Sequence, residues 1–260
     1  MVYSHPMDRE KPAAILPLCL LLVAIFASGC GKEIVPAASE LMTESYSRPD
    51  FSNIAIGYPD AKSFQMTATR GQDQYCMVQE PATIRPTAPI MIYMHGADGD
   101  ETQGMDPEYA EGTFARLRTL LADRGWIYVT ARIDDFDGLR KDLESKYGPR
   151  PIILSGSSLG GKQSLMEAMA NPGEYAGVIA MCPALPLTDA SPAKALTMPV
   201  YIESGERDVL IAEVSRRIAG VLKRQGTPYI YIEIPEGTHR TPIEQIDWER
   251  ALGFVEDHLS

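Results

Sequence analysis

Short apolar runs alternate with amphipathic stretches along the chain from about residue 60 onward. The run 88–94 is continuously apolar, which is typical of a strand buried on both faces of a sheet. The stretch that follows spaces Phe114, Leu117 and Leu121 at helical intervals. Gly125 comes directly after this stretch and suits the C-terminus of a helix. The pattern therefore predicts a buried strand followed by an amphipathic helix.

The same alternation continues to the C-terminus. Further strands are predicted at 63–70, 74–80, 126–133, 150–156, 176–183, 198–205 and 228–235, and helices at 107–125, 137–148, 160–173, 209–226 and 242–259. The first two strands suit an antiparallel pair joined at Gly71. The regular strand–helix alternation after them predicts an α/β fold, with a mainly parallel sheet and helices on both faces. Ligands bind beyond the carboxyl ends of the strands in such sheets, so candidate site residues are expected there.

The N-terminal segment has a different character. An apolar run from 13 to 30 follows Arg9 and Lys11 and closes with small residues. This arrangement is typical of a secretory signal peptide, which we expect over 1–29. The run is short for a membrane span, so a retained anchor is the weaker alternative.

The signal peptide ends in Gly29-Cys30, which resembles the lipobox of bacterial lipoproteins. In that family the cysteine takes a diacylglycerol and becomes the first residue of the mature chain. The resemblance implies a lipid anchor at Cys30, a flexible tether over 30–50 and a folded domain over 51–260. It also implies a location in the bacterial cell envelope, and Gly31 permits sorting to the outer membrane. An ordinary signal peptide with an unmodified Cys30 is the alternative.

Charge and cysteine content narrow the range of partners. The formal net charge is −11, which disfavours binding to nucleic acid or to anionic lipid by charge alone. Two cysteines, Cys76 and Cys182, fall within the predicted domain. They could pair in an oxidising compartment, but we favour two buried, unpaired thiols, because neither lies in a cysteine-rich framework. No Cys/His cluster has metal-binding spacing, so neither a metal nor a cofactor is expected.

A pair of serines follows the predicted strand 150–156. A serine nucleophile must be lifted clear of the sheet on a sharp strand-to-helix turn, whose flanking residues have to be small. Ser158 satisfies this requirement, because Gly156 and Gly160 flank it in a G-x-S-x-G pattern. Ser157 does not, because Leu159 would occupy the tight position. With a strand before it and a helix after it, this motif resembles that of the α/β-hydrolase family, and the resemblance covers about residues 60 to 260.

The strand 88–94 is followed by His95-Gly-Ala-Asp-Gly99, which resembles the H-G-x-x-G oxyanion loop of that family. The resemblance implies that the backbone N–H groups of Ala97 and Leu159 hold the oxyanion of a tetrahedral intermediate. It also implies that His95 braces the loop and is not the catalytic base. The acidic residues of this loop are interpreted as a solvated rim that would disfavour anionic substrates if it faced the site: Asp98, Asp100 and Glu101.

Two further strand ends supply the rest of a triad. Asp208 follows the strand 198–205 and resembles the family's acid, with Glu203 and Glu206 as competitors. His239 follows the strand 228–235 and resembles the family's base, which would accept the serine proton. The other histidines suit this role less, because one lies in the signal region and one on the polar face of the last predicted helix. The chain order serine, aspartate, histidine is the order that this family uses.

These residues predict a serine esterase that forms an acyl-serine intermediate, with a small-molecule ester as substrate. The segment 183–198 is short and rich in small residues, so no large lid is expected and the site should be open. The surroundings of the oxyanion loop resemble the phospholipase/carboxylesterase and dienelactone-hydrolase-like branches. A non-catalytic binding or assembly lipoprotein is the first alternative. A peptidase or an acyltransferase that uses the same triad is the second.

Overall fold

The computed structural model describes residues 61–66, 74–97, 99–131, 136–186, 193 and 195–259. All of them belong to one compact unit, Asp50–Ser260. The predicted signal peptide, Cys30, the tether and Asp98 lie outside the described residues, so these predictions stay predictions.

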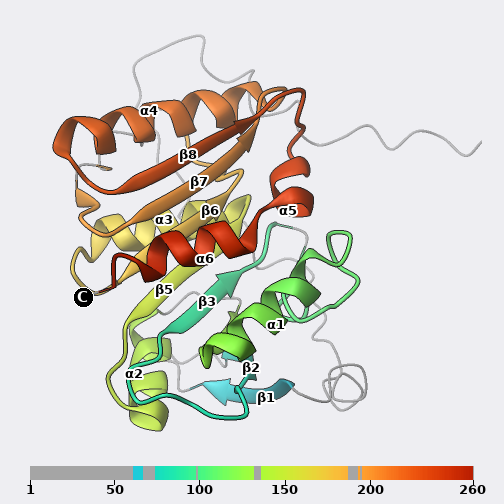
Figure 1. Ribbon diagram of the computed structural model, residues 1–260, viewed down its shortest axis with the longest axis vertical. Helices are drawn as coiled ribbons and strands as arrows, with labels where there is room; N and C mark the ends of the chain where they lie inside the picture. The colour runs from blue at the N-terminus through green and yellow to red at the C-terminus, as the bar shows by residue number, and fades with distance from the viewer. Residues whose placement is uncertain are drawn as a thin grey trace, which may run out of the picture. The chain divides into compact units, whose positions relative to one another are not determined.

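The described strands form one mainly parallel sheet (Figure 1). They are β1 (Ala61–Met66), β2 (Gln74–Gln79), β3 (Ile90–Met94), β4 (Ile127–Ala131), β5 (Ile152–Ser157), β6 (Gly177–Met181), β7 (Val200–Gly205) and β8 (Tyr229–Ile234). Their order is β1-β2-β4-β3-β5-β6-β7-β8. β2 runs antiparallel to β1 and β4, and every pair from β4 to β8 is parallel. The predicted α/β class and the antiparallel pair at the start of the domain are therefore confirmed.

Six helices are described: α1 (Thr113–Arg124), α2 (Phe136–Tyr147), α3 (Leu159–Ala170), α4 (Val209–Gln225), α5 (Thr241–Gln245) and α6 (Trp248–Glu256). α1 and α4 end at glycines in the left-handed conformation, with φ of 70° at Gly125 and 75° at Gly226, because glycine adopts this conformation without steric cost.

Two helix predictions were wrong in extent. The helix predicted at 107–125 begins only at Thr113, because three consecutive residues before it, Ala110 to Gly112, have positive φ. The helix predicted at 242–259 is split into α5 and α6. Ile246 leaves the helical conformation with φ −53° and ψ 132°, and the Asp247 side chain then caps α6 by accepting a hydrogen bond from the Arg250 N–H.

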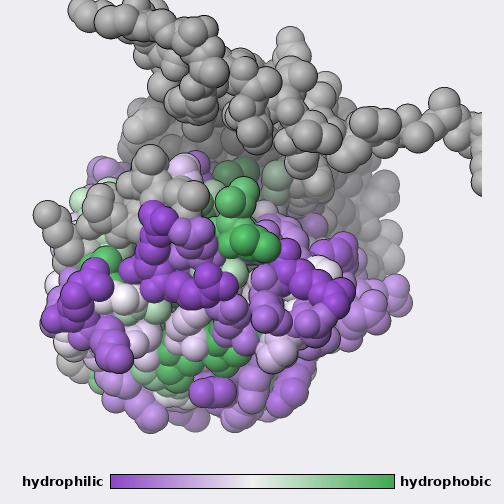
Figure 2. Space-filling view, turned by 90° about the horizontal axis from the view of Figure 1, so that it is seen from above, coloured by the Kyte–Doolittle hydropathy of each residue, from purple (hydrophilic) through white to green (hydrophobic). Residues whose placement is uncertain are grey.

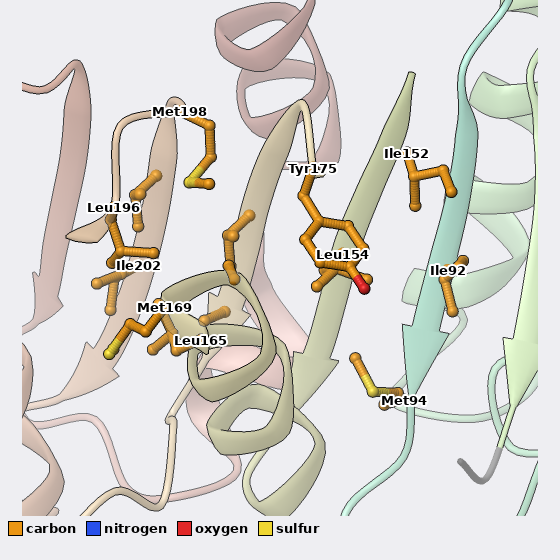
Figure 3. Close-up of a cluster of buried hydrophobic side chains, with 14 of the residues drawn as sticks. Ile92, Met94, Ile152, Leu154, Leu165, Met169, Tyr175, Leu196, Met198 and Ile202 are labelled. Atoms are coloured by element: carbon orange, nitrogen blue, oxygen red, sulfur yellow. The ribbon is translucent and has the colours of Figure 1, made fainter. Parts of the chain in front are cut away.

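Helices cover both faces of the sheet, as predicted. In Figure 1, α1 and α6 lie in front of the sheet and α3 lies behind it. Successive residues of a strand point to opposite faces, so Ile152 and Leu154 of β5 join one buried cluster and Ile153 joins the other. The first cluster includes residues of α2, α3 and α4, and part of it is drawn in Figure 3. The second includes residues of α1 and α6. Burying a side chain such as Leu154 contributes about 1.5–3 kcal/mol to stability.

Cys76 and Cys182 are both buried and neither forms a disulfide, as the sequence favoured. They belong to the two clusters on opposite faces of the sheet, so they cannot form a disulfide within this fold. Burial raises the pKa of the Cys76 thiol far above its ordinary value, which keeps that thiol neutral.

The described surface exposes few large hydrophobic side chains, and the connection between β6 and β7 is short. The face in Figure 2 is largely hydrophilic, with small hydrophobic groups. Among the described residues, the large hydrophobic side chains that are exposed are Met166, Val209 and Leu210. β6 ends at Met181 and β7 begins at Val200, which leaves no room for a large lid between them. None of the helices in the described ranges has the length and apolar character that crossing a membrane requires.

Candidate active site

Ser158 is the single residue between β5 and α3, and it lies on a strained turn. Its φ of 53° and ψ of −113° lie outside the regions that most residues occupy. The turn is tight because backbone packs against backbone on both sides. A Cβ on Gly156 would lie 2.4 Å from the carbonyl carbon of Gly160, and one on Gly160 would lie 2.0 Å from the carbonyl oxygen of Met94. The two glycines of the motif are therefore sterically required.

The two neighbouring serines have different environments. Ser157 is fully buried, and its hydroxyl lies 2.9 Å from the hydroxyl of Tyr93. Ser158 is half-buried, and its hydroxyl lies 2.9 Å from Nε2 of His239. The structure thus directs Ser157 into the core and leaves Ser158 as the candidate nucleophile, as the glycine spacing predicted.

His239 links Ser158 to Asp208. Its Nδ1 lies 2.5 Å from Oδ2 of Asp208. The hydrogen bond to Asp208 raises the pKa of His239 well above its ordinary value, and the neighbouring Cys182 adds to this shift, although partial burial acts against it. The carboxylate therefore makes Nε2 of His239 a stronger base toward the Ser158 hydroxyl, and it stabilises the imidazolium that forms when this proton is taken.

The loops that carry Asp208 and His239 interlock. The N–H of Arg207 donates to the carbonyl of Gly237 at 2.8 Å. A Cβ on Gly205 would lie 2.3 Å from the carbonyl oxygen of Thr238, so the loops approach through backbone that leaves no room for a side chain. An ion pair between Arg207 and Glu236 adds a contact at the surface.

The two competing acids do not contact the histidine. Glu203 is buried in β7 and accepts a hydrogen bond from the Tyr201 hydroxyl at 2.6 Å. Burial raises the pKa of Glu203, while the bond from Tyr201 acts in the opposite direction. Glu206 is exposed and accepts the N–H of Glu236 at 2.9 Å. Asp208 is therefore the acid that the structure places against His239.

The loop after β3 lies against the candidate nucleophile. A Cβ on Gly96 would be 3.5 Å from the Cβ of Ser158, which is ordinary contact distance. His95 is buried, and its Nδ1 lies 2.6 Å from the Gly96 carbonyl oxygen, an arrangement that suits a brace. Neither Ala97 nor Leu159 uses its N–H in a hydrogen bond to another described residue. Both N–H groups can therefore donate to a ligand, and that of Leu159 belongs to the first turn of α3, where the helix provides no acceptor.

The acidic rim predicted around this loop was wrong for Glu101, which is buried. Asp100 accepts hydrogen bonds from the N–H of Thr102 at 2.9 Å and from its hydroxyl at 2.5 Å. Its carboxylate therefore holds the local turn. Asp98 lies outside the described residues.

Sequence reasoning missed Cys182, a buried residue that follows β6 and adds to the upward shift in the pKa of His239. The signal was present in the strand order. β5, β6, β7 and β8 are consecutive neighbours, so the residues that follow them meet at one edge of the sheet. Ser158, Cys182, Asp208 and His239 each follow one of these four strands. No group of His, Cys, Asp or Glu in the described ranges could hold a metal ion.

The strand order and the site geometry can be compared with known proteins. No protein-family model and no curated protein matches the chain. Solved structures do match, at low sequence identity. A thermostable esterase superimposes with a TM-score of 0.63 and 17% identity, over 79% of this chain and 64% of that one. An S-formylglutathione hydrolase from Agrobacterium tumefaciens gives 0.59 and 13%, over 77% of this chain and 95% of that one.

The chain has the α/β-hydrolase fold. An acylaminoacyl peptidase from Pyrococcus horikoshii also shares this fold, with a TM-score of 0.60 and 14% identity over 76% of this chain. The chain spans only 42% of that peptidase and 64% of the esterase. The likeness therefore extends to the α/β-hydrolase core, and the activity has to be argued from the site.

Proposed function

We propose that the protein is a serine hydrolase that cleaves carboxylic esters through an acyl-serine intermediate. The observation that carries the proposal is the unbroken hydrogen-bond chain from Asp208 through His239 to Ser158. A nucleophile within hydrogen-bond reach of a base, with the base oriented by a third group, is the arrangement that activates a serine. The α/β-hydrolase fold supports the assignment, because it presents these groups at neighbouring strand ends.

Each group of the site has a defined role in this proposed reaction. His239 takes the Ser158 proton at Nε2 while the Ser158 oxygen attacks the ester carbonyl carbon. The N–H groups of Ala97 and Leu159 donate to the oxyanion of the tetrahedral intermediate. His239 then protonates the leaving alcohol as the carbon–oxygen bond breaks. Water attacks the acyl-serine by the same route and releases the acid, which restores the free hydroxyl of Ser158.

The openness of the site supports small or accessible esters as substrates. The His239 side chain is 43% exposed, and the short chain between β6 and β7 cannot cover it with a large lid. A substrate can therefore reach Ser158 without passing through a buried tunnel. Esters are favoured over amides because an open, wet site gives less electrostatic help to the expulsion of a poor leaving group.

A fluorophosphonate tests the nucleophile directly. The full-length chain, solubilised in detergent, is incubated with the reagent, and its intact mass is measured beside Ser157→Ala and Ser158→Ala. We expect one adduct in the wild type and in Ser157→Ala and none in Ser158→Ala, because only Ser158 contacts His239. Folded wild-type protein that takes no label would contradict the hydrolase proposal and favour a binding or assembly role on this fold.

Hydrolysis and acyl transfer to another acceptor share the first half of the reaction. A competing alcohol or amine, added during turnover of one ester, distinguishes them by the products. We expect the free acid to remain the main product at millimolar acceptor. A main product acylated on the added acceptor would replace the hydrolase proposal with a transferase, whereas cleavage of peptides at rates equal to those of esters would favour a peptidase.

We also propose that Cys30 anchors the chain to the bacterial cell envelope, on the strength of the signal-like segment and the Gly29-Cys30 ending. Partitioning between a detergent phase and an aqueous phase tests this in cells that express the full-length chain. We expect the wild type in the detergent phase and Cys30→Ser in the aqueous or uncleaved fraction. Equal partitioning of the two, with wild-type processing of the variant, would exclude lipidation at Cys30.

A further inference from the structure

Backbone strain gathers around the candidate active site. Within the described ranges, the non-glycine residues with positive φ are Ala110, Glu111, Ser158, Cys182 and Glu236. Three of them belong to the site already described: the nucleophile, the cysteine beside the histidine and a residue of the histidine loop. Strained conformations persist only where the surrounding structure holds them, and they concentrate where function needs a particular geometry. Ala110 and Glu111 are the two that the triad does not explain.

The strained turn ends the loop that leads from the oxyanion region into α1, and it fixes the residue before it, Tyr109. The Tyr109 ring packs on Phe114 with centroids 5.2 Å apart, and Phe114 packs on Tyr93 at 4.7 Å. The Tyr93 hydroxyl lies 2.9 Å from that of Ser157, the residue before the nucleophile. Two ring contacts and one hydrogen bond therefore connect Tyr109 with the turn that carries Ser158.

A second set of contacts places Tyr109 on the histidine side of the site. The Thr113 hydroxyl donates to the Glu244 carbonyl at 2.9 Å, which joins the start of α1 to α5. α5 begins two residues after His239, and the two helices lie close together in Figure 1. Burial raises the pKa of Tyr109, and the nearby charge of Arg240, the residue after His239, acts in the opposite direction.

The chemistry of Tyr109 suits contact with a ligand. The residue is half-buried, and its hydroxyl makes no hydrogen bond to another described residue. Burial raises its pKa above the ordinary value, so the phenol stays a neutral donor. Its ring packs on the fully buried Phe114, which is itself held by the buried rings of Tyr93 and Trp248. A rigid aromatic side chain with an unused donor binds planar groups at low entropic cost.

We propose that Tyr109 contacts the alcohol part of the ester and favours esters of aromatic alcohols that carry a hydrogen-bond acceptor. This inference rests on the proposed function, because it follows from the proton path. His239 delivers its proton to the leaving alcohol, so the alcohol part lies on the histidine side of the scissile bond. Tyr109 belongs to the segment that the Thr113–Glu244 hydrogen bond joins to α5, which begins just after His239. The acyl part remains on Ser158 after the alcohol has left, and Tyr109 plays no role in its hydrolysis.

Three butyrate esters test the inference: ethyl, phenyl and 4-acetylphenyl. All form the same butyryl-serine, so the rate of deacylation is common to them and kcat/KM reports acylation. In the detergent-solubilised full-length chain, we expect Tyr109→Ala to lower kcat/KM for both aryl esters about tenfold more than for the ethyl ester. We expect Tyr109→Phe to lower it about three- to tenfold for the acetylphenyl ester alone. The deacylation rate should stay within about twofold of the wild type in both variants, because the alcohol has already left.

Tyr229 of β8 provides the matched control, since it is also half-buried with no side-chain hydrogen bond to a described residue. Tyr229→Phe and Tyr229→Ala should leave the ester preference unchanged. Losses that are equal for all three esters, or that extend to deacylation, would show that Tyr109 is only structural and overturn the inference. If Tyr109→Ala does not fold, an unchanged acetylphenyl preference in Tyr109→Phe overturns it equally.

Fluorophosphonate labelling separates this inference from the proposed function. A wild type that neither labels nor cleaves esters removes both. A wild type that labels at Ser158 and cleaves esters, but whose preference does not depend on Tyr109, removes only the inference about the alcohol part.

Discussion

Gly160→Ala should disable the candidate site through backbone geometry alone. The added Cβ would lie 2.0 Å from the Met94 carbonyl oxygen and 2.6 Å from that of His95. Real Cβ contacts do not fall under 3.0 Å, so α3 and the end of β3 must separate by about 1 Å. This movement shifts the Leu159 N–H and Ser158 relative to the oxyanion loop.

The expected magnitudes follow from that displacement. A misplacement of about 1 Å at reacting groups costs about 100-fold in rate, so we expect at least this loss in kcat/KM. Overpacking should also lower the free energy of unfolding by about 1–3 kcal/mol, partly offset by the better helix propensity of alanine. Ester hydrolysis and urea denaturation of the same preparations measure the two effects.

Substitutions at two other glycines provide comparisons for Gly160→Ala. A Cβ on Gly161 would lie 3.1 Å from the carbonyl oxygens of Gly156 and Met181, so Gly161→Ala should have a small effect. A Cβ on Gly253 of α6 would meet nothing within 4 Å, so Gly253→Ala should raise stability by about 0.5–1 kcal/mol and leave activity unchanged. Wild-type activity and stability in Gly160→Ala would refute the close approach of α3 to β3 and, with it, the steric explanation of the motif.

Three further predictions follow from hydrogen bonds and pKa shifts. Asp208→Asn should lower kcat by about 10³–10⁴-fold, because the group that orients His239 and stabilises its imidazolium is gone. The pH at which kcat/KM rises should also move down, because the carboxylate that raises the pKa of His239 is gone. Ester assays at several pH values give kcat and kcat/KM, and an acidic limb that does not move would contradict the assignment. Tyr93→Phe should cost about 1–3 kcal/mol in urea denaturation, because the buried Ser157 hydroxyl loses its partner, while fluorophosphonate labelling persists; a loss of labelling with unchanged stability would reverse this view. Glu203→Gln should be more stable than the wild type at neutral pH, because burial raises the pKa of Glu203 and its ionisation therefore opposes folding as pH rises above about 4.5. The difference in the free energy of unfolding should vanish at lower pH, and a difference that does not depend on pH would contradict this prediction.

The sequence predicted the fold well because burial constrains the pattern. The continuous apolar run at 88–94 favoured a strand covered on both faces, and β3 is buried along its whole length. Helix starts were less predictable. Nothing in the composition of Ala110 and Glu111 indicates positive φ, because neither residue type favours the left-handed conformation.

The structure brings together Ser158, Asp208 and His239, which the strand-end argument had singled out, because that argument needs only the order of elements. The environment of the site was less predictable. The burial of Glu101, the hydrogen bond of Ser157 to Tyr93 and the position of Cys182 all depend on which strands are neighbours in the sheet. A single sequence does not contain that information directly, and residues far apart in the chain supply each contact.

The glycines show where this limit lies. Gly156 and Gly160 are readable as a motif because each stands two residues from Ser158 in the sequence, although Gly160 packs against the distant Met94 of β3. Gly205 and Gly237 meet the same physical demand, since a Cβ on Gly205 would lie 2.4 Å from the Gly237 carbonyl oxygen. Because these two glycines are far apart along the chain, the sequence does not show that they pack together. Their packing nevertheless holds the loops of Asp208 and His239 close to each other. The G-x-S-x-G motif therefore indicates only part of the backbone packing at the site. The packing of Gly205 against Gly237 becomes apparent only when β7 and β8 are known to be neighbours in the sheet.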